Sequence, residues 1–251
     1  MYQLDNLKKF SGLVHGFSDA KDGNMSFNWG EKESVAKNKS RFLSLLGIKP
    51  EDCVMTGVSH GNSIEIIYKY FKRRGTGAGI SDEANADAIM TDEKGIFLMI
   101  LTADCLPVVL YDPVKSAVAL AHLSRINTPE NFICSVVEKM KTEFGTAPEN
   151  LIVGIGPCIH KESYVFSTEE LRKRVSDEKI FKGFIYDLPD GKKSIDLVGY
   201  NVKELISAGV QGKNIEISEI DTFQNTGFFS HRRSVLTGSP EGRMAIVVGM
   251  K

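Results

Sequence analysis

Short apolar segments rich in β-branched residues recur along the chain and are separated by polar or glycine-containing turns. This pattern is typical of β-strands, and each segment is far shorter than the roughly 20 apolar residues that a membrane-spanning helix requires. The segments predicted as strands are Val54–Ser59, Ser63–Tyr68, Gly95–Leu101, Pro107–Tyr111, Ser116–His122, Leu151–Ile155 and Ala245–Val248. The pattern therefore predicts a protein with a large β component and no membrane span.

Three longer segments carry apolar residues at the 3.6-residue spacing of an amphipathic helix. They are Val35–Leu46, Pro129–Phe144 and Asp196–Ala208. A glycine follows each segment, and glycine favours the backbone conformation that ends a helix. Pro129 suits a first helical turn, and Asp196 suits an N-cap.

The connections between the middle strands are too short to hold a crossover helix. We therefore expect Gly95–Leu101 to pair with Pro107–Tyr111, and Pro107–Tyr111 to pair with Ser116–His122, both antiparallel. Strands in such meanders, followed by helices, predict an α/β fold in the broad sense, with a mixed sheet layered with helices. We expect one domain over residues 1–251. The two most polar loops are Arg73–Asp82 and Asp187–Ser194.

Composition narrows the class of partner. The 251 residues are 42% hydrophobic and 25% charged, with a net charge of −1, so no electrostatic feature favours nucleic acid or an anionic membrane. The N-terminus has no apolar stretch of signal-peptide length. The four cysteines, Cys53, Cys105, Cys134 and Cys158, form no CxxC pair. Reduced thiols and a cytoplasmic location are therefore predicted.

Candidate chemistry lies where strands end. Asp104 and Cys105 interrupt an apolar run, and a hairpin of the next two strands would return His122 beside Cys105. His60 lies in another corner after a strand. Two imidazoles, a thiolate and an open position make a suitable catalytic zinc site. The spacing matches no zinc finger, and each residue alone also suits a structural role, as a small buried thiol or a hydrogen-bonded histidine.

Several motifs make the chain resemble the laccase-domain family, once labelled multicopper polyphenol oxidoreductases. The motifs are HGFS at 15–18, SFNWG at 26–30, SHGN at 59–62, ADAIMTD at 86–92, LTADCLPVVLYDP at 101–113, AVALAH at 117–122, IGPCI at 155–159, FFSHRR at 228–233 and GRMA at 242–245. The resemblance runs from about His15 to the C-terminus. It implies a zinc-dependent purine nucleoside phosphorylase with adenosine deaminase side activity, acting on a small-molecule nucleoside and phosphate.

The resemblance also implies roles for individual residues. His60, Cys105 and His122 occupy the positions of the family's metal ligands. The SFNWG motif, with Asn28, and the FFSHRR motif are expected to line the pocket. The resemblance further implies a fold like that of cytotoxic-necrotizing-factor catalytic domains.

Other roles follow from side-chain chemistry. Asp104, beside a ligand, is a candidate proton carrier in deamination, and the alternative is a hydrogen bond that orients a ligand. His231, Arg232 and Arg233 could hold an anion, since guanidinium groups bind oxyanions in a bidentate way. The alternative for these three is a solvated charged surface.

The chain departs from the family's usual pattern beside the metal. Family members continue from the last ligand as HAGWRG, whereas this chain has HLSRIN at 122–127, with Arg125 one position earlier than the usual arginine. A later CTYC-like passage is replaced by DTFQ at 221–224. The loss of both glycines predicts a differently shaped loop, because glycine reaches backbone conformations closed to other residues.

Two other functions remain open. Cys105 and His122 could form the nucleophile and base of an amidase-like hydrolase acting on peptidoglycan precursors. The altered loop also keeps open a metal-binding protein without catalysis. Copper-dependent phenol oxidation is disfavoured, because a multicopper site needs about ten clustered histidines and this chain has five. The preferred nucleoside and the oligomeric state stay undetermined.

Overall fold

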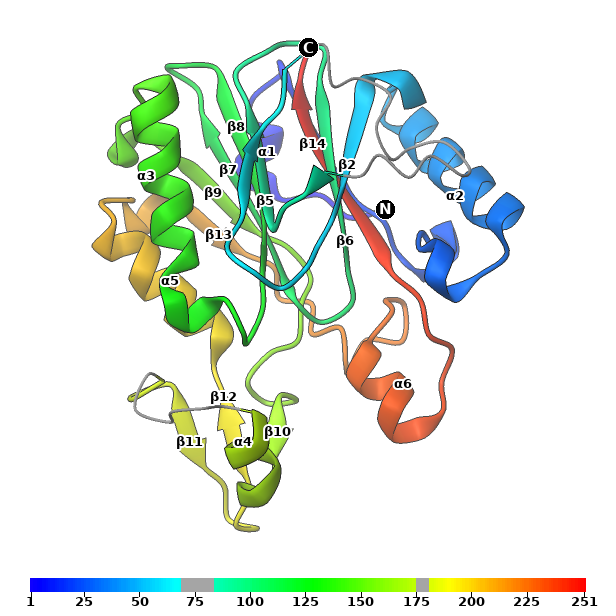
Figure 1. Ribbon diagram of the computed structural model, residues 1–251, viewed down its shortest axis with the longest axis vertical. Helices are drawn as coiled ribbons and strands as arrows, with labels where there is room; N and C mark the ends of the chain where they lie inside the picture. Colours follow the sequence, from blue (N-terminus) through cyan, green and yellow to red (C-terminus); the bar gives the residue numbers. More distant parts are fainter. Residues whose placement is uncertain (69–83, 175–180) are drawn as a thin grey trace.

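Two β-sheets packed face to face form the centre of the molecule, with helices on both outer sides (Figure 1). The computed structural model describes residues 1–68, 84–174 and 181–251. One sheet has the order β1-β14-β6-β2-β4, made of Leu13–Phe17, Met244–Met250, Phe97–Thr102, Cys53–Gly57 and Ala84–Asn85. The other has the order β13-β9-β7-β8-β5-β3, made of Ile215–Ile217, Ile152–Ile155, Leu106–Asp112, Ala117–Leu123, Ala88–Thr91 and Ile64–Ile66.

Helices cover the outer face of each sheet (Figure 1). Helix α2 (Lys32–Leu45) packs on the five-stranded sheet, and α3 (Phe132–Phe144) and α5 (Leu197–Ser207) pack on the six-stranded one. The shorter α-helices are α1 (Asp5–Lys8), α4 (Thr168–Arg174) and α6 (His231–Thr237). A small sheet of β10 (Val165–Phe166), β12 (Lys193–Ile195) and β11 (Ile185–Asp187) extends from one end of the molecule.

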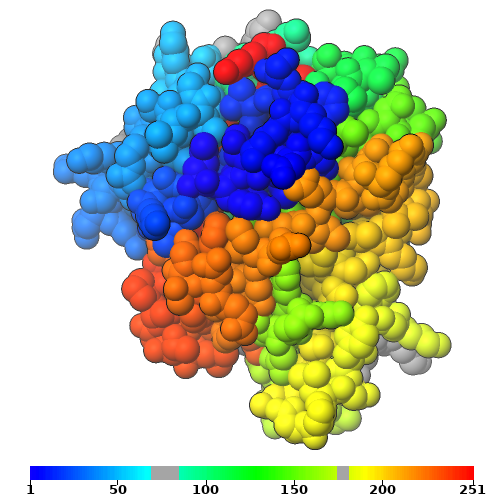
Figure 2. Space-filling model, turned by 180° about the vertical axis from the view of Figure 1, so that it is seen from behind, coloured from blue at the N-terminus to red at the C-terminus, as the bar shows by residue number. Residues whose placement is uncertain are grey.

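The N-terminal segment is tied to the six-stranded sheet. Figure 2 shows from behind that its residues lie beside those near position 215. The Glu216 carboxylate accepts hydrogen bonds from the backbone N–H groups of Asp5 and Asn6. The first residues of the chain are therefore part of the packed structure.

Strand β8 shows how the sequence produces these layers. Its side chains alternate, so Val118 and Leu120 enter the core between the two sheets, while Ala119 and Ala121 face the helices. Small alanines on that face leave room for the large side chains of α3, such as Phe132. Both faces of the strand are buried, which explains its continuous apolar run.

Each of the seven predicted strands corresponds to an observed strand, and no end differs by more than two residues. The predicted helices also occur. However, α3 begins at Phe132, because Thr128–Glu130 form a separate 3-10 turn and Asn131 has φ 55°. The predicted start at Pro129 was therefore wrong. Asp196 does cap α5, since its carboxylate accepts a hydrogen bond from the Gly199 N–H at 2.7 Å.

The predicted strand pairing was half right. β7 and β8 form an antiparallel hairpin with Pro107 opposite His122. β6 does not pair with β7, because the chain passes from one sheet to the other at residues 103–105, and β6 pairs with β14 and β2 instead. The single mixed sheet of the prediction is therefore two sheets. A strand buried on both faces carries no periodicity that says which sheet it joins.

The remaining structural predictions have separate outcomes. The loop predicted at Asp187–Ser194 is the turn of the β11–β12 hairpin, whose strands reach into both its ends. The loop predicted at Arg73–Asp82 lies outside the described residues. In the part of the chain that is described, no helix has both the length and the apolar character to cross a membrane. One domain over residues 1–251, and the likeness to cytotoxic-necrotizing-factor domains, stay predictions.

Candidate metal centre and adjoining pocket

Three segments bring the predicted ligands together. Cys105 ends the passage between the two sheets, His122 lies in β8, and His60 lies in the turn that follows β2. Because the hairpin register sets His122 opposite Pro107, it lies close to Cys105. One donor atom of each residue lies within 4.8 Å of the others, so the group could hold a metal ion. His122 is buried, Cys105 is half-buried and His60 is exposed, which leaves the cluster open on one side.

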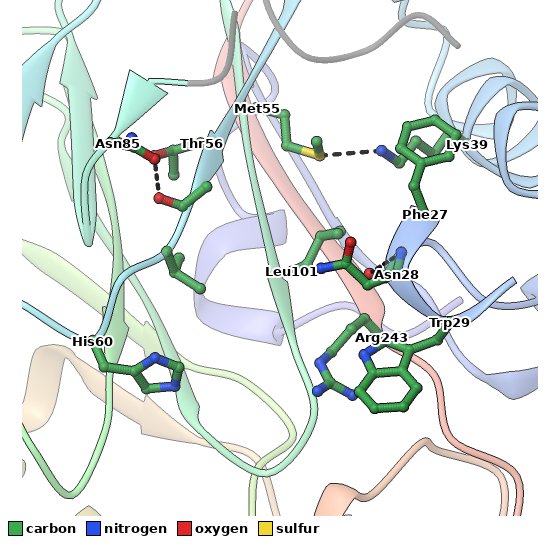
Figure 3. A pocket seen from close by; sticks show the side chains of 13 residues that line it. Phe27, Asn28, Trp29, Lys39, Met55, Thr56, His60, Asn85, Leu101 and Arg243 are labelled. Carbon is green, nitrogen blue, oxygen red and sulfur yellow. Dashed lines mark hydrogen bonds between the residues drawn. The ribbon is translucent and has the colours of Figure 1, made fainter. Parts of the chain in front are cut away.

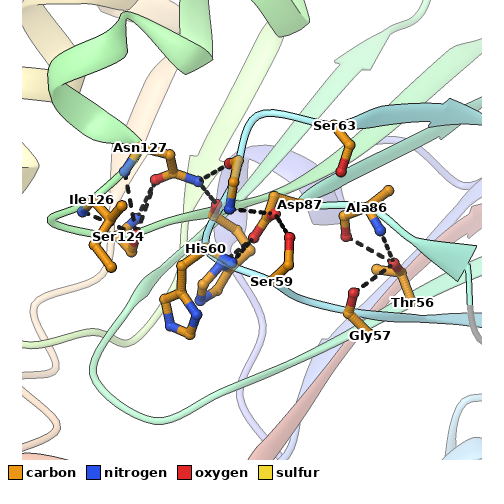
Figure 4. Close-up of polar contacts among 12 residues, drawn as sticks. Thr56, Gly57, Ser59, His60, Ser63, Ala86, Asp87, Ser124, Ile126 and Asn127 are labelled. Carbon is orange, nitrogen blue, oxygen red and sulfur yellow. Dashed lines mark hydrogen bonds and ion pairs between the residues drawn. The ribbon is translucent and has the colours of Figure 1, made fainter.

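A buried aspartate connects two of the three ligands (Figure 4). The Asp87 carboxylate accepts hydrogen bonds from the backbone N–H groups of His60 at 2.8 Å and Gly61 at 2.7 Å, and from the Ser59 hydroxyl at 2.9 Å. It also lies 3.2 Å from Nδ1 of His122. Asp87 therefore fixes the His60 turn and leaves Nε2 of His122 as the nitrogen available to a metal.

The charges of the cluster favour a thiolate. Burial alone would raise the pKa of Cys105, but the imidazoles of His122 and His60 outweigh it and lower that pKa to about 6. Burial alone would likewise lower the pKa of His122, whereas Cys105 and Asp87 raise it to about 9. A deprotonated sulfur is the form that binds metals and acts as a nucleophile.

Asn127 holds the altered loop against the ligands (Figure 4). Its Nδ2 donates to the carbonyls of Gly61 and His122, each at 3.0 Å, and its Oδ1 accepts from the Ser124 N–H at 2.7 Å. No residue from 123 to 127 has a positive φ. The loop thus needs no glycine, and it links the segments that carry His60 and His122.

Asp104 has different partners from Asp87. Its carboxylate accepts hydrogen bonds from the Thr222 hydroxyl and the Arg232 backbone N–H, both at 2.7 Å. Its backbone has φ 83°, in the left-handed region that non-glycine residues seldom adopt. One oxygen therefore ties the Cys105 corner to Thr222, and the other ties it to the start of α6. The role of Asp104 in proton transfer stays a prediction.

The basic motif at 231–233 is largely engaged with the protein. His231 lies 3.2 Å from the Glu241 carboxylate and is more than half exposed. Arg233 donates from Nη1 to the carbonyls of Thr222 and Phe223 at 2.6 and 3.0 Å, and from Nη2 to that of Phe228 at 2.5 Å. Binding of an anion by these residues stays a prediction.

The Arg232 side chain is also engaged with the protein. It donates to the Val165 carbonyl, and its guanidinium carbon lies 4.3 Å from the Phe166 ring centroid. Burial and then the charge of Cys105 raise the pKa of Tyr164 to about 12, against the lowering effects of Arg125 and Arg232. The phenol of Tyr164 therefore lies within the electrostatic influence of Cys105 and of both arginines.

A pocket of about 430 Å³ opens beside His60 (Figure 3). It is bounded by the five-stranded sheet, by the 3-10 helix η2 (Phe27–Trp29) and by α2. Its lining residues are Ser26, Phe27, Asn28, Trp29, Lys39, Met55, Thr56, Gly57, Val58, His60, Asn85, Leu101 and Arg243. The predicted residue Asn28 is therefore in this wall, together with two cations and two aromatic rings.

Sequence reasoning missed several residues of this region. Asp87 lies within the ADAIMTD motif, and an acidic residue inside an apolar strand segment is the signal that could have identified it. Asn127, Lys39 and Arg243 carry no such signal, because each is an ordinary surface residue type until the fold brings it to the cluster or the pocket. Trp29 lies within the SFNWG motif that was expected to line the pocket, and the structure has it in this wall.

The fold and the cluster define a class of protein: a layered α/β protein with a His–Cys–His group whose exposed member, His60, lines a mixed polar and aromatic pocket. A family model described as multi-copper polyphenol oxidoreductase laccase matches residues 10–251. The chain belongs to this family, which confirms the resemblance.

Relatives and a solved structure agree with this assignment. A purine nucleoside phosphorylase of Bacteroides thetaiotaomicron is 27% identical, over 93% of this chain and 91% of the relative. An adenosine deaminase, RL5, from an unknown prokaryotic organism is 30% identical, over 75% and 72%. The crystal structure of YlmD from Geobacillus stearothermophilus has a TM-score of 0.87 at 25% identity, covering 99% of this chain and 94% of that one.

Proposed function

We propose that this protein is a zinc-dependent purine nucleoside phosphorylase that also deaminates adenosine at the same site. The observation that carries the proposal is the convergence of His60, Cys105 and His122, with His60 also lining a pocket large enough for a nucleoside. The names of the relatives support the substrate class. The substrates would be a nucleoside and phosphate, without a nucleic acid or membrane partner, and a cytoplasmic location stays a prediction.

The donor set fits zinc. Two imidazole nitrogens and one thiolate are ligands that catalytic zinc sites use, with a fourth position left for water or substrate. The lowered pKa of Cys105 supplies the thiolate near neutral pH, and Asp87 presents His122 in the required orientation. Zinc held by these residues would supply a Lewis acid that polarises a substrate oxygen or acidifies water.

The protein's own groups would position the other reactant. In phosphorolysis a phosphate oxygen bonds to C1′ of the ribose, and the purine leaves with the electrons of the glycosidic bond. Two groups of cations suit this anion: Lys39 and Arg243 lie in the pocket wall, and Arg125 and Arg232 act on the Tyr164 phenol, which Cys105 also influences. We assign a positioning role to Arg233 and Asp104, because their side chains form hydrogen bonds with residues between 222 and 232.

Product analysis tests the proposal. Purified protein is incubated with adenosine, inosine or guanosine, with and without phosphate, and the products are separated. Release of free base and ribose 1-phosphate only when phosphate is present supports phosphorolysis, and inosine formed from adenosine supports deamination. His122→Ala should abolish both reactions. Turnover by that variant equal to that of the parent protein would refute the assigned site.

A second candidate function has its own observation. Asp87, His122 and Cys105 are arranged as an acid, a base and a nucleophile, with the Asp87 carboxylate 3.2 Å from His122 and a thiol of lowered pKa. This is the order of groups in a thiol hydrolase. Amidase activity that resists chelators but is lost on thiol alkylation would favour it. Activity removed by chelation and restored by zinc would favour the metal.

A further inference from the structure

The only tryptophan of the chain lies in the wall of the pocket. Trp29 is the last residue of η2, and its side chain is 47% exposed although the neighbouring Ser26 and Lys39 are buried. Large aromatic rings are usually covered in a monomeric protein, and a half-exposed ring in a concave site is a common ligand contact.

Trp29 stands on a well-supported element. The Ser26 hydroxyl caps η2 by accepting from the Asn28 N–H, and the Trp29 N–H donates to the Ser26 carbonyl at 3.2 Å. The segment is also tied to the start of β14, because the Met25 N–H donates to the Arg243 carbonyl at 3.0 Å. The backbone that carries the exposed ring is therefore fixed by hydrogen bonds, so binding a planar ligand there orders less of the chain.

The surroundings of the ring indicate which ligand it fits. The guanidinium carbon of Arg243 lies 5.3 Å from the Trp29 ring centroid. Nη1 of Arg243 donates hydrogen bonds to the Glu241 carboxylate and the Gly242 carbonyl. Figure 3 shows Trp29 and Arg243 across the pocket from His60. A ligand that reaches the metal ligands at one end therefore meets an indole at the other. A fused bicyclic purine matches the indole in shape and area better than a single-ring pyrimidine does.

We infer that Trp29 is the platform on which the purine base stacks, and that it selects purine over pyrimidine nucleosides. The inference rests on the proposed function for the identity of the ligand. Stacking of a base on an aromatic side chain contributes enough that its loss weakens binding by about 10- to 100-fold.

Intrinsic fluorescence tests the inference directly, because all tryptophan emission comes from this one residue. Inosine is titrated into the protein without phosphate, so that phosphorolysis cannot proceed, and uridine is the matched control. We expect saturable quenching by inosine and at least tenfold weaker quenching by uridine.

Two substitutions complete the test. Trp29→Ala should raise the KM for inosine phosphorolysis about tenfold or more and change kcat much less, and Trp29→Phe should recover most of the loss because it keeps an aromatic face. The side chain is half-exposed, so both variants should fold, which thermal unfolding checks.

The outcomes separate the inference from the proposed function. Turnover of inosine without saturable quenching, or equal quenching by inosine and uridine, would overturn the stacking role and leave the phosphorylase proposal standing. Selective quenching by inosine without any turnover would support the stacking role and refute the phosphorylase proposal.

Discussion

Two buried histidines, His122 in the ligand cluster and His15 in β1, have opposite electrostatic environments. The two side chains are 2% and 1% exposed. His122 lies between the Cys105 thiol and the Asp87 carboxylate, and they raise its pKa to about 9 against the effect of burial. The ring of His15 accepts the Leu4 N–H at 3.0 Å, and burial lowers its pKa to about 4. The groups that contact a buried imidazole, more than the extent of its burial, therefore decide its pKa and whether it suits a reactive site or the core.

The largest expected effect distinguishes the two histidines by metal binding. His122→Ala removes one of three candidate ligands, so the zinc content of purified protein should fall from near one equivalent to less than about a tenth. His15→Gln is the matched control, because a glutamine oxygen can still accept the Leu4 N–H, and it should retain zinc. Elemental analysis measures both. Equal zinc content in the two variants would place the metal elsewhere.

The next effect tests the carboxylate that makes His122 different. Asp87→Asn keeps the size of the side chain but removes the charge that orients His122 and the His60 turn, so zinc affinity should fall about 10- to 100-fold. Asp104→Asn is the control, because that carboxylate bonds to Thr222 and Arg232 instead. Competition with a chromogenic chelator measures the affinities. A loss in Asp104→Asn as large as that in Asp87→Asn would contradict the separate roles of the two aspartates.

The smallest effect concerns the core histidine and pH. The folded pKa of His15 lies below its ordinary value of 6.5, so the unfolded chain binds the proton more readily. The contribution of neutral His15 to the free energy of unfolding is therefore fully present above pH 6.5. It is lost as the pH falls towards about 4, so the free energy of unfolding should decrease by roughly 2 kcal/mol between pH 7 and pH 4.5.

Urea unfolding of the parent protein and of His15→Gln at the two pH values checks this expectation. The carboxylates of both proteins titrate alike, so the difference between the two pH dependences isolates His15. Parallel loss of stability in parent and variant would show that this imidazole does not control the acid sensitivity.

The candidate site was predictable from the sequence only in part. Cys105 and His122 could be placed together, because a short connection forces a hairpin and the strand lengths then set the register. His60 could be named as a candidate from its corner after a strand and from the family resemblance, but no local rule brings a turn after β2 to the end of β8. The pairing of β6 with β7 was wrong for a related reason: a short link can also carry the chain from one sheet to another.

The sequence by itself determined what depends on near neighbours: the strands, the helix ends at Asp196 and Gly145, and the approach of Cys105 to His122. Only the tertiary structure decided the division into two sheets, the Asp87 hydrogen bonds that join the His60 turn to His122, and the place of Lys39 and Arg243 in the pocket wall. Local patterns fix local geometry because few backbone conformations satisfy them. Contacts between distant segments instead depend on which apolar faces pack together and which buried polar groups form hydrogen bonds. The sequence of a single strand or turn does not specify those pairings.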